Sequence, residues 1–449
     1  MNKYYIGIDI GTTSTKSILF NSHGNIEKKV VKEYPIYSEY HDFREQDPEE
    51  IFNAVIETTK TLIEKSNVHR NDIKFISFSA MMHSLIAVDK DCKPLTKCII
   101  LADNRSEKYV KKFKENGLGK KLYLKTGTPC HPMSPFYKLL WMKDNNAEIF
   151  KKSYKFVSIK SYIFYKFFNK YVEDYSIASS SGIFNIFNMK WDDEILNILD
   201  IDEDKLPKTV PTTFTIKNLN KEYIGYMGLT EDTVFVIGAS DGCLANLGAN
   251  VIKKDAAVAT IGTSGAVRIV SDKPLTDDLE RTFCYVLTED KYVVGGAINN
   301  GGIVYRWFKE NLCENESITA KEQGKDTYEI LNKYVEEIEA GSNGLLFLPF
   351  LSGERAPYWD ADLRGAFVGI GDIHNKKHMT RALIEGICFG MNEVFLAIKD
   401  LVGDIESIYA NGGFTRSQDK KVYKNLSNIY GQTVEALKPV NKKLVKYQR

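Results

Sequence analysis

The sequence predicts two related α/β domains, and three observations support this prediction. The first is a strand–turn–strand pattern over residues 4–20, in which apolar and β-branched runs flank a turn at Gly11-Thr12-Thr13. The second is a copy of that pattern over residues 256–270, around Gly262-Thr263-Ser264. The third is the length of 449 residues, which is too long for a single hydrophobic core. Because the pattern occurs twice, we expect two domains of one kind.

The two turns have the composition of phosphate-binding turns. Each offers a glycine for close backbone approach, hydroxyl groups and backbone N–H groups. A third glycine turn, Gly412-Gly413, follows another strand and could contact adenosine. Any one of these turns could be an ordinary hairpin, but three of them spread over both halves indicate ATP. Asp9, at the end of the first strand, could hold Mg²⁺ through water.

The first 104 residues read as a mixed sheet with one helix. A third strand is expected at 27–36, and others at 73–79 and 99–104. Asp47-Pro48 begins the helix, because Asp is a favoured N-cap and Pro suits the first helical position. Strands interleaved with a helix make a ribonuclease-H-like sheet plausible.

The remainder of the first domain is mostly helical. We expect helices at 107–121, from Phe136 onward and at 156–168, and an amphipathic segment at 191–199. The serine-rich stretch at 176–188 could line a site or be a plain loop. A strand at 234–238 then leads into Ser240-Asp241-Gly242. We place the domain boundary just after it, giving domains at 1–246 and 247–449.

After its hairpin, the second domain also combines strands with helices. Expected strands lie at 292–298, 344–351 and 407–410, and expected helical segments at 303–311, 321–341 and 378–399. An ordered loop is expected at 352–360.

Asp241 has the position of a general base. Phosphoryl transfer to an alcohol needs a carboxylate near the attacking hydroxyl, and Asp241 directly follows a strand at the inferred cleft. The alternative is a turn aspartate that caps a helix starting at Gly242.

Composition excludes several other classes of protein. A net charge of +1 gives no support for nucleic-acid binding. The seven cysteines form no CxxC pair, which is typical of reduced thiols in a cytoplasmic protein. No signal peptide and no run long enough to span a membrane is visible.

The chain closely resembles the FGGY carbohydrate kinases over nearly its full length. Residues 133–145 look like the first signature of that family, and residues 365–370 with 378–385 look like the second. The resemblance implies two ribonuclease-H-like domains of the actin/hexokinase type that close on Mg-ATP and a sugar or polyol. It also implies that Asp241 is the catalytic base and that Asp9, together with Asp241, orders the metal.

Within this family the details look most like the members that act on gluconate. The similarity lies in residues 82–87, 102–106, 299–303 and 353–359. His83 could donate a hydrogen bond to a substrate hydroxyl. Arg105 could pair with the carboxylate of a sugar acid, or it could form a structural ion pair instead. The candidate substrate residues are therefore Met82, His83, Ser84, Asp103, Arg105 and Asp241.

The candidate ATP-binding residues are spread over both domains. They are Gly11, Thr12, Thr13, Lys16, Gly262, Thr263, Ser264, Gly302, Arg306, Gly412, Gly413 and Ser417.

One departure from the family pattern concerns the C-terminus. After Glu435 the family continues with a small-residue helix, whereas this chain has Leu437-Lys438-Pro439-Val440 and a basic tail. We therefore expect the second domain to lack its last helix and to expose apolar surface either on a face of the helix at 378–399 or on the sheet beside Tyr409.

The expected function is ATP-dependent phosphorylation of a sugar acid, D-gluconate to 6-phospho-D-gluconate. The alternatives are a pentulose kinase, such as one acting on xylulose, and a truncated inactive protein that binds ATP or sugar. No nucleic-acid or membrane partner is expected, and a homodimer remains open.

Overall fold

Both expected strand–turn–strand patterns are present in the computed structural model, which describes residues 3–411 and 420–448. In the first, β1 (Tyr4–Ile10) pairs antiparallel with β2 (Ser14–Asn21) across the turn at residues 11–13. In the second, β15 (Ala256–Ile261) pairs antiparallel with β16 (Gly265–Ser271) across the turn at residues 262–264. The internal repeat predicted from the sequence is therefore confirmed.

The chain divides into two compact units. The first contains Met1–Asn250 with Ser271–Asp278 and Phe283–Val293, and the second contains Val251–Val270, Leu279–Thr282 and Val294–Arg449. The chain thus passes between the units several times, once within β16 and once within β18 (Lys291–Ile298). The expected boundary at residue 246 falls inside α10 (Asp241–Gly248), and the division into domains at 1–246 and 247–449 stays a prediction.

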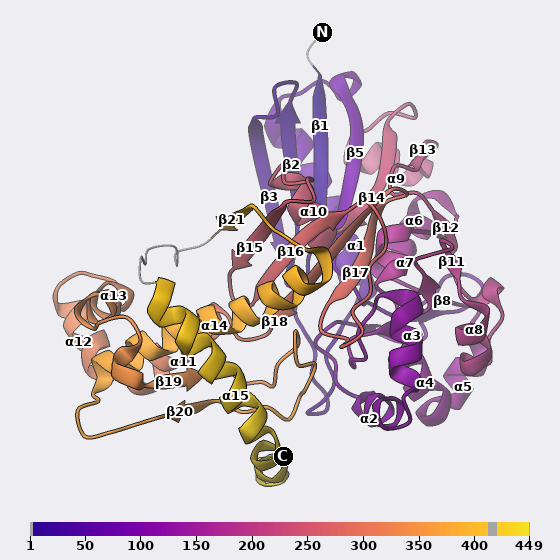
Figure 1. Cartoon of the computed structure of the whole chain (residues 1–449). Coiled ribbons are helices and arrows are strands. Elements are labelled where there is room, and N and C mark those ends of the chain that lie inside the picture. The colour runs from indigo at the N-terminus through magenta and orange to yellow at the C-terminus, as the bar shows by residue number, and fades with distance from the viewer. Residues whose placement is uncertain (1–2, 412–419, 449) are drawn as a thin grey trace. The chain divides into compact units, whose positions relative to one another are not determined.

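The first unit is built on a six-stranded mixed sheet of order β13-β14-β5-β1-β2-β3 (Figure 1). Its strands are β1, β2, β3 (Ile26–Glu33), β5 (Ile73–Ala80), β13 (Thr215–Ile216) and β14 (Val234–Ser240). β5 runs parallel to both β1 and β14, whereas β2 runs antiparallel to β1 and β3. This is the mixed sheet expected from the sequence.

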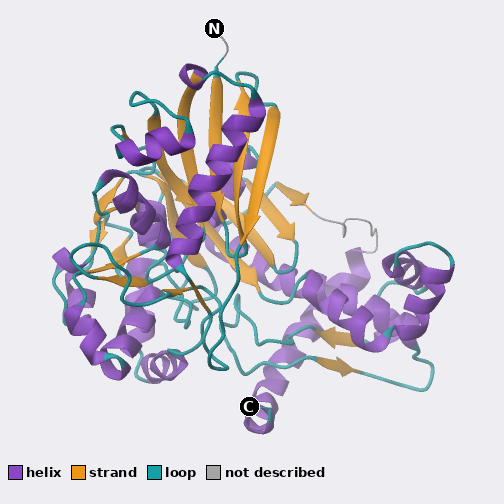
Figure 2. Ribbon diagram, turned by 180° about the vertical axis from the view of Figure 1, so that it is seen from behind, coloured by secondary structure: helices purple, strands orange, loops and turns teal. Residues whose placement is uncertain are grey.

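The helix α1 (Pro48–Ser66) packs on this sheet, and Figure 2 shows a long helix lying across the strands. The Asp47 side chain accepts a hydrogen bond from the Glu49 N–H at 2.8 Å, and Pro48 occupies the first turn, as predicted. The apolar face buries Ile51, Val55 and Leu62 in the core of the first unit. This fixes the helix over β2 and β3.

The other elements of the first unit are shorter. Its remaining helices are α2 (Glu107–Glu115), α3 (Leu118–Thr126), α4 (Pro135–Asn145), α5 (Ala147–Lys152), α6 (Ile159–Phe168), α7 (Tyr175–Ser179), α8 (Asp193–Leu199), α9 (Lys221–Met227) and α10. Its remaining strands are β4 (Glu45–Gln46), β6 (Ile86–Val88), β7 (Cys98–Ile99), β8 (Lys155–Val157), β9 (Val172–Asp174), β10 (Phe184–Asn185), β11 (Lys190–Trp191), β12 (Lys208–Val210) and β17 (Phe283–Thr288). Single 3₁₀ turns lie at Arg70–Asp72 and Glu203–Lys205.

Three expectations for this unit were wrong in detail. The helix expected at 107–121 is two helices, because Gly117 adopts a positive φ of 74° between them. The strand expected at 99–104 ends at Ile99, since the following residues turn to place Asp103. The serine-rich stretch begins as the helix α7, because the Asp174 side chain caps it by accepting the Ile177 N–H at 3.0 Å.

The second unit combines the hairpin β15–β16 with a helical layer. Its strands are β15, β16, the second part of β18, β19 (Leu346–Leu348), β20 (Ala366–Val368) and β21 (Ser407–Asn411). Its helices are α11 (Gly302–Leu312), α12 (Glu314–Glu322), α13 (Thr327–Glu337), α14 (Lys376–Val402) and α15 (Lys420–Leu444), with 3₁₀ turns at Ser342–Gly344 and Val445–Tyr447. The strand expected at 344–351 is confirmed only over β19. The helix expected at 378–399 is present as α14.

The C-terminal segment is helical rather than an irregular tail. The helix α15 continues through Glu435 to Leu444, and its Tyr430 and Val434 are fully buried in a cluster with Phe350 and Phe389. Within that cluster the Tyr430 and Phe389 rings lie 5.5 Å apart. After Glu435, Leu437 packs against the same cluster and Val445 is buried, so these residues also have a structural place. The absence of a further family helix stays a prediction.

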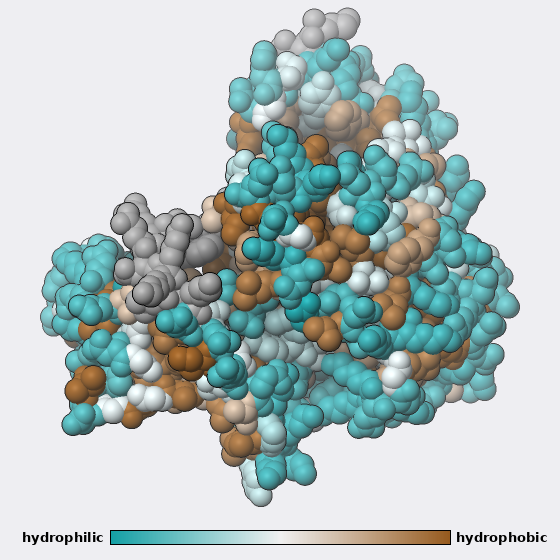
Figure 3. Space-filling view, in the orientation of Figure 1, coloured by the Kyte–Doolittle hydropathy of each residue, from teal (hydrophilic) through white to brown (hydrophobic). Residues whose placement is uncertain are grey.

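The strand β21 presents apolar side chains to water. It pairs in parallel with β15 on one side and lies at the end of its sheet. Ile408 and Tyr409 are 51% and 54% exposed, and the surface around β21 carries brown apolar patches in Figure 3. The exposure expected beside Tyr409 is thus observed. In the described ranges, no helix has both the length and the apolar character needed to cross a membrane.

Candidate functional site

The carboxyl ends of three parallel strands bring the first group of candidate residues to one edge of the sheet. Asp9 in β1 is in register with Ser79 in β5, and Ser79 is in register with Ala239 in β14. The turn at residue 11, the loop at residue 81 and Asp241 therefore leave the sheet at the same level. With strands about 4.8 Å apart, the ends of β1 and β14 are separated by roughly 10 Å.

Asp241 is exposed at the start of α10 and is not needed as its cap. The Ser240 side chain is the N-cap and accepts a hydrogen bond from the Cys243 N–H at 3.3 Å. The Asp241 carboxylate accepts the N–H of its neighbour Gly242 at 2.6 Å. The alternative in which Asp241 caps a helix starting at Gly242 is therefore wrong, since the cap is one residue earlier.

Asp9 and the turn that follows it are held from several directions. The Lys16 ammonium lies 3.0 Å from Asp9 Oδ2, and the Ser79 hydroxyl donates to Asp9 Oδ1 at 3.1 Å. Behind the turn, the Tyr34 hydroxyl donates to the Gly11 carbonyl and the Gln46 amide donates to the Thr12 carbonyl. Because these carbonyls already have donors, the turn is fixed before any ligand binds.

The carboxylates suit a water-bridged cation better than a directly ligated one. Among the described residues, no group of three His, Cys, Asp or Glu side chains is placed to hold a metal ion. Asp9 and Asp241 lie at strand ends separated by β5. Mg²⁺ keeps several waters and takes one or two carboxylates plus phosphate oxygens, so these two residues fit it.

His83 adopts a conformation that its surroundings impose. It has a positive φ of 64°, which is uncommon outside glycine, and its side chain is buried. Its Nδ1 lies 2.8 Å from the Ser180 carbonyl, so Nδ1 carries the proton. In a neutral ring Nε2 is then a hydrogen-bond acceptor, which differs from the donor role expected from the sequence.

The other substrate candidates differ in exposure. Met82 is half-buried against the core, and Met81, just before it, donates its N–H to the Ile10 carbonyl. Ser84 is buried, and its hydroxyl accepts the Ile159 N–H at the start of α6 at 3.0 Å. Ser84 therefore serves the packing of α6.

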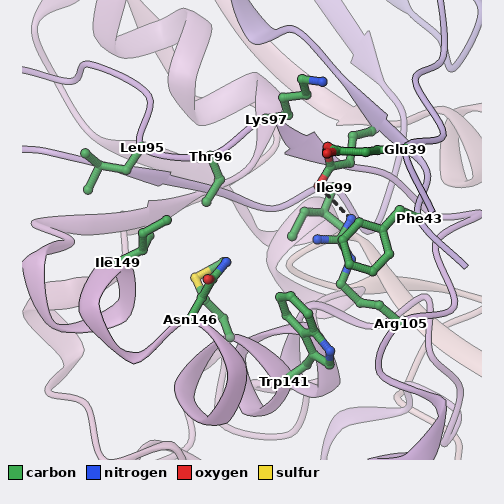
Figure 4. A pocket seen from close by; sticks show the side chains of 12 residues that line it. Glu39, Phe43, Leu95, Thr96, Lys97, Ile99, Arg105, Trp141, Asn146 and Ile149 are labelled. Carbon is green, nitrogen blue, oxygen red and sulfur yellow. Dashed lines mark hydrogen bonds and ion pairs between the residues drawn. The ribbon is translucent and has the colours of Figure 1, made fainter.

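Asp103 and Arg105 form a buried ion-pair cluster with Glu45. The Arg105 guanidinium donates to both carboxylate oxygens of Asp103, at 2.8 and 2.7 Å, and to Glu45 at 2.6 Å. It also stacks on the Phe43 ring, 3.6 Å from the centroid, at the wall of a pocket of about 210 Å³ (Figure 4). The structural ion pair left open by the sequence is thus present. A contact between Arg105 and a substrate carboxylate stays a prediction.

Lys138 is a positioning group that the sequence analysis did not single out. Its side chain is fully buried in α4, and its ammonium donates to the carbonyls of His83 at 2.6 Å, Ile100 at 2.9 Å and Ile99 at 3.3 Å. Burial lowers the pKa of Lys138 to about 7. This one side chain joins the His83 turn to the strand that leads to Asp103.

The second unit places its turn against a helix N-terminus. The Gly302 N–H donates to the Gly262 carbonyl at 2.7 Å, and the Ile303 N–H donates to the Thr263 carbonyl at 3.1 Å. A Cβ atom on Gly302 would lie 2.7 Å from the Gly262 oxygen, so only glycine fits there. Thr263 and Ser264 are exposed beside the positive end of α11, which favours phosphate.

Arg306 lies one turn further along α11, on the same face as Gly302, and is exposed. Gly412, Gly413 and Ser417, the candidate adenosine contacts, lie outside the described residues.

A buried carboxylate fixes the loop before α11. Glu354 accepts the Asn299 N–H at 2.5 Å and the Asn300 side-chain amide at 3.0 Å. The side-chain oxygen of Asn300, Oδ1, in turn accepts the Leu351 N–H at 3.1 Å. Burial raises the pKa of Glu354 to about 7, although these N–H groups oppose the shift.

The two halves match the two domains of one enzyme family. Residues 4–248 match the N-terminal domain of the FGGY family of carbohydrate kinases, and residues 257–445 match its C-terminal domain. The chain belongs to the FGGY family of carbohydrate kinases. It is therefore a sugar kinase with the two-domain actin/hexokinase-type fold, as expected, and kinases of this family use ATP.

Individual FGGY kinases differ in how similar they are to this chain. A gluconokinase from Bacillus subtilis (strain 168) is 48% identical over 93% of this chain and 81% of its own length. A xylulose kinase from the same strain is 30% identical over 92% of this chain and 80% of its own length. Among solved structures, a gluconate kinase from Lactobacillus acidophilus matches with a TM-score of 0.87 and 38% identity, covering 95% of this chain and 85% of that one.

Proposed function

We propose that this FGGY kinase transfers the γ-phosphoryl group of ATP to the terminal hydroxyl of a sugar acid, D-gluconate, with Asp241 as general base. The observation that carries the proposal is the common edge of β1, β5 and β14. It supplies an exposed carboxylate, Asp241, level with Asp9 and the turn at residue 11, while Ser240 takes over the capping role. The exposed Asp241 carboxylate at this edge suits proton transfer.

The residues around the two glycine turns fit the phosphates of ATP. In the first unit the N–H groups and hydroxyls of Thr12 and Thr13 would contact phosphate oxygens. In the second unit Thr263, Ser264 and the start of α11 would do so, with Arg306 as a further cation. Asp9 and Asp241 would hold Mg²⁺ through water, and ATP supplies the phosphoryl group.

The chain's own part in the reaction is a single proton transfer. As the terminal hydroxyl oxygen forms a bond to the γ-phosphorus, its proton passes to the Asp241 carboxylate. The bond between the γ-phosphorus and the bridging oxygen breaks, and ADP carries away the electron pair of that bond. The exposed start of α10 allows Asp241 to release the proton to water afterwards.

The identity levels support gluconate as the substrate. The Bacillus subtilis gluconokinase exceeds the xylulose kinase of the same strain by 48% to 30% over nearly equal spans. His83, with Nε2 as an acceptor, would receive a hydrogen bond from a substrate hydroxyl. Arg105 keeps one guanidinium nitrogen beyond those bonded to Asp103 and Glu45, and we propose it as the cation for the carboxylate.

A second candidate is a pentulose kinase. A structure described as a ligand-bound xylulose kinase from Lactobacillus acidophilus is also 38% identical to this chain, with a TM-score of 0.86 and coverage of 96% and 84%. Structural similarity alone therefore favours neither substrate.

A substrate panel separates these candidates. We expect ADP release in a coupled assay to be at least ten times faster per unit enzyme with D-gluconate than with D-xylulose or glycerol at equal, subsaturating concentrations. A tenfold preference corresponds to about 1.4 kcal/mol, the lower end of a charge-assisted hydrogen bond. Equal rates on xylulose and gluconate would transfer the assignment to the pentulose kinases. A cytoplasmic location and a homodimer stay predictions.

A further inference from the structure

The short helix α7 lies directly against the end of β14 that carries Asp241. All of its serines are buried, together with the two that follow, and whether the stretch at 176–188 lines a site stays a prediction. Its polar groups bond to neighbouring segments. Ser176 bonds to Ser240, the residue before Asp241, and Ser180 bonds to His83.

Ser176 holds the last residue of β14. Its Oγ accepts the Ser240 N–H at 3.1 Å and shares a hydrogen bond with the Ser240 hydroxyl at 2.9 Å. Ser240 is the residue before Asp241 and caps α10. One hydroxyl of α7 thus fixes both the backbone and the cap from which Asp241 projects.

A buried ion pair holds the preceding residue of the same strand. The Lys160 ammonium donates to the Ala239 carbonyl at 3.0 Å and to Asp174 Oδ2 at 2.7 Å, and both side chains are 0% exposed. Asp174 is also the cap of α7. A lysine in α6 and the cap of α7 therefore meet at the strand end, two residues before Asp241.

The far end of α7 holds His83. The Ser180 carbonyl, which follows the last residue of α7, accepts the His83 Nδ1–H at 2.8 Å. The Ser181 carbonyl accepts the Ser134 hydroxyl at 2.7 Å in the loop before α4. One short helix is thus bonded to the segment that carries the proposed base and to a proposed substrate contact.

We infer that Ser176, supported by the Lys160–Asp174 ion pair, is a positioning residue that sets Asp241 against the hydroxyl to be phosphorylated. This inference rests on the proposed function, because it assigns a role to Ser176 only if Asp241 is the base. General-base catalysis depends on sub-ångström placement, and a displacement of about 1 Å can cost a hundredfold in rate. Ser176 is fully buried and acts through Ser240.

Ser179 provides a matched control within the same helix. Its hydroxyl is also fully buried, donates to the Ser176 carbonyl at 2.9 Å and accepts the Val286 N–H at 2.9 Å. Ser179→Ala therefore removes a hydroxyl with two hydrogen bonds, as Ser176→Ala does, but the partners it releases are the Ser176 carbonyl within α7 and the Val286 N–H in β17, and none lies in β14.

The experiment compares Ser176→Ala and Ser179→Ala in the full chain, each with Asp241 intact and with Asp241→Asn. With Asp241 intact, we expect Ser176→Ala to lower kcat for gluconate by roughly ten- to a hundredfold with KM for ATP unchanged, and Ser179→Ala to lower kcat less than threefold. With Asp241→Asn, Ser176→Ala should not reduce the residual rate further, because no base remains to be positioned.

Two results would overturn the inference. One is an equal fall in kcat for both alanine variants, and the other is the same fold-loss from Ser176→Ala on both backgrounds, as general destabilisation would give. If Ser176→Ala does not fold, Ser176→Cys keeps a side chain of similar shape with a weaker hydrogen-bond acceptor and donor and should show a smaller loss of kcat; wild-type kcat in that variant would count against the inference. Wild-type turnover in Asp241→Asn alone would instead refute the base assignment.

Discussion

At the scale of single residues, buried ionisable side chains act as clamps on backbone segments. Lys138 donates to three carbonyls around His83, and Lys160 donates to the carbonyl two residues before Asp241. Glu354 accepts N–H groups from the loop that leads into α11. Because an unmet buried polar group costs about 1–3 kcal/mol, each clamp restricts its segment to one arrangement.

Glu354 gives the free energy of unfolding a defined pH dependence. Its pKa is raised from 4.5 to about 7 in the folded state, so the folded protein binds more protons than the unfolded chain between these values. Stability linked to this group is therefore highest below pH 4.5 and falls as pH rises toward 7. The Glu354→Gln variant lacks the titration. We expect the wild type to lose about 2–3 kcal/mol relative to Glu354→Gln between pH 5 and pH 8.

Urea unfolding of both proteins at the two pH values measures this difference. The variant itself is expected to be destabilised by a constant amount, since the glutamine amide would face the Asn300 amide, a donor against a donor. The prediction concerns only how the difference in free energy of unfolding between the wild type and Glu354→Gln changes with pH. Parallel stability curves for the two proteins would show that Glu354 is ionised throughout.

At the scale of elements, the ends of β1, β5 and β14 carry the proposed catalytic residues, and the N-terminus of α11 is the proposed second phosphate contact. Among the described elements, β21 is weakly protected. It is an edge strand with half-exposed apolar side chains on both of its faces, Ile408 on one and Tyr409 on the other. An exposed apolar edge is a template for pairing with other chains.

This exposure predicts that β21 drives aggregation. Ile408→Thr and Ile408→Val are a matched pair, because Thr and Val have nearly the same shape and both favour strands. We expect Ile408→Thr to aggregate more slowly than Ile408→Val during incubation at a temperature below unfolding, as followed by light scattering. The melting temperatures of the two should agree within a few degrees. Equal aggregation rates would indicate that another surface is responsible.

At the scale of the whole molecule, the sequence predicted the parts whose causes are local. The two glycine turns, the Asp47-Pro48 start of α1 and the strand before Asp241 are set by neighbouring residues, and the structure has them. The two-domain fold and the FGGY family were also predicted, because their motifs are long and specific.

The clamps could not be predicted, since their partners are distant in sequence. Lys138 bonds to a carbonyl 55 residues away and Lys160 to one 79 residues away. Because every residue has a backbone carbonyl, the sequence does not reveal which one accepts. The one available signal was a lone lysine within the apolar run of α4. The choice between two roles for Arg105 likewise depended on Glu45, 60 residues away. The N-cap of α10 is Ser240 and not Asp241. The sequence could not separate these two residues, because both are good caps.

The most direct test of the central claim is the turnover of Asp241→Asn with D-gluconate and ATP. The substitution keeps the size of the side chain but removes the carboxylate that accepts the proton. We predict that kcat falls by roughly 10²–10⁴, the usual contribution of a general base, while ATP binding measured by calorimetry stays within a factor of about three. Turnover of gluconate by Asp241→Asn at the wild-type rate would contradict the account.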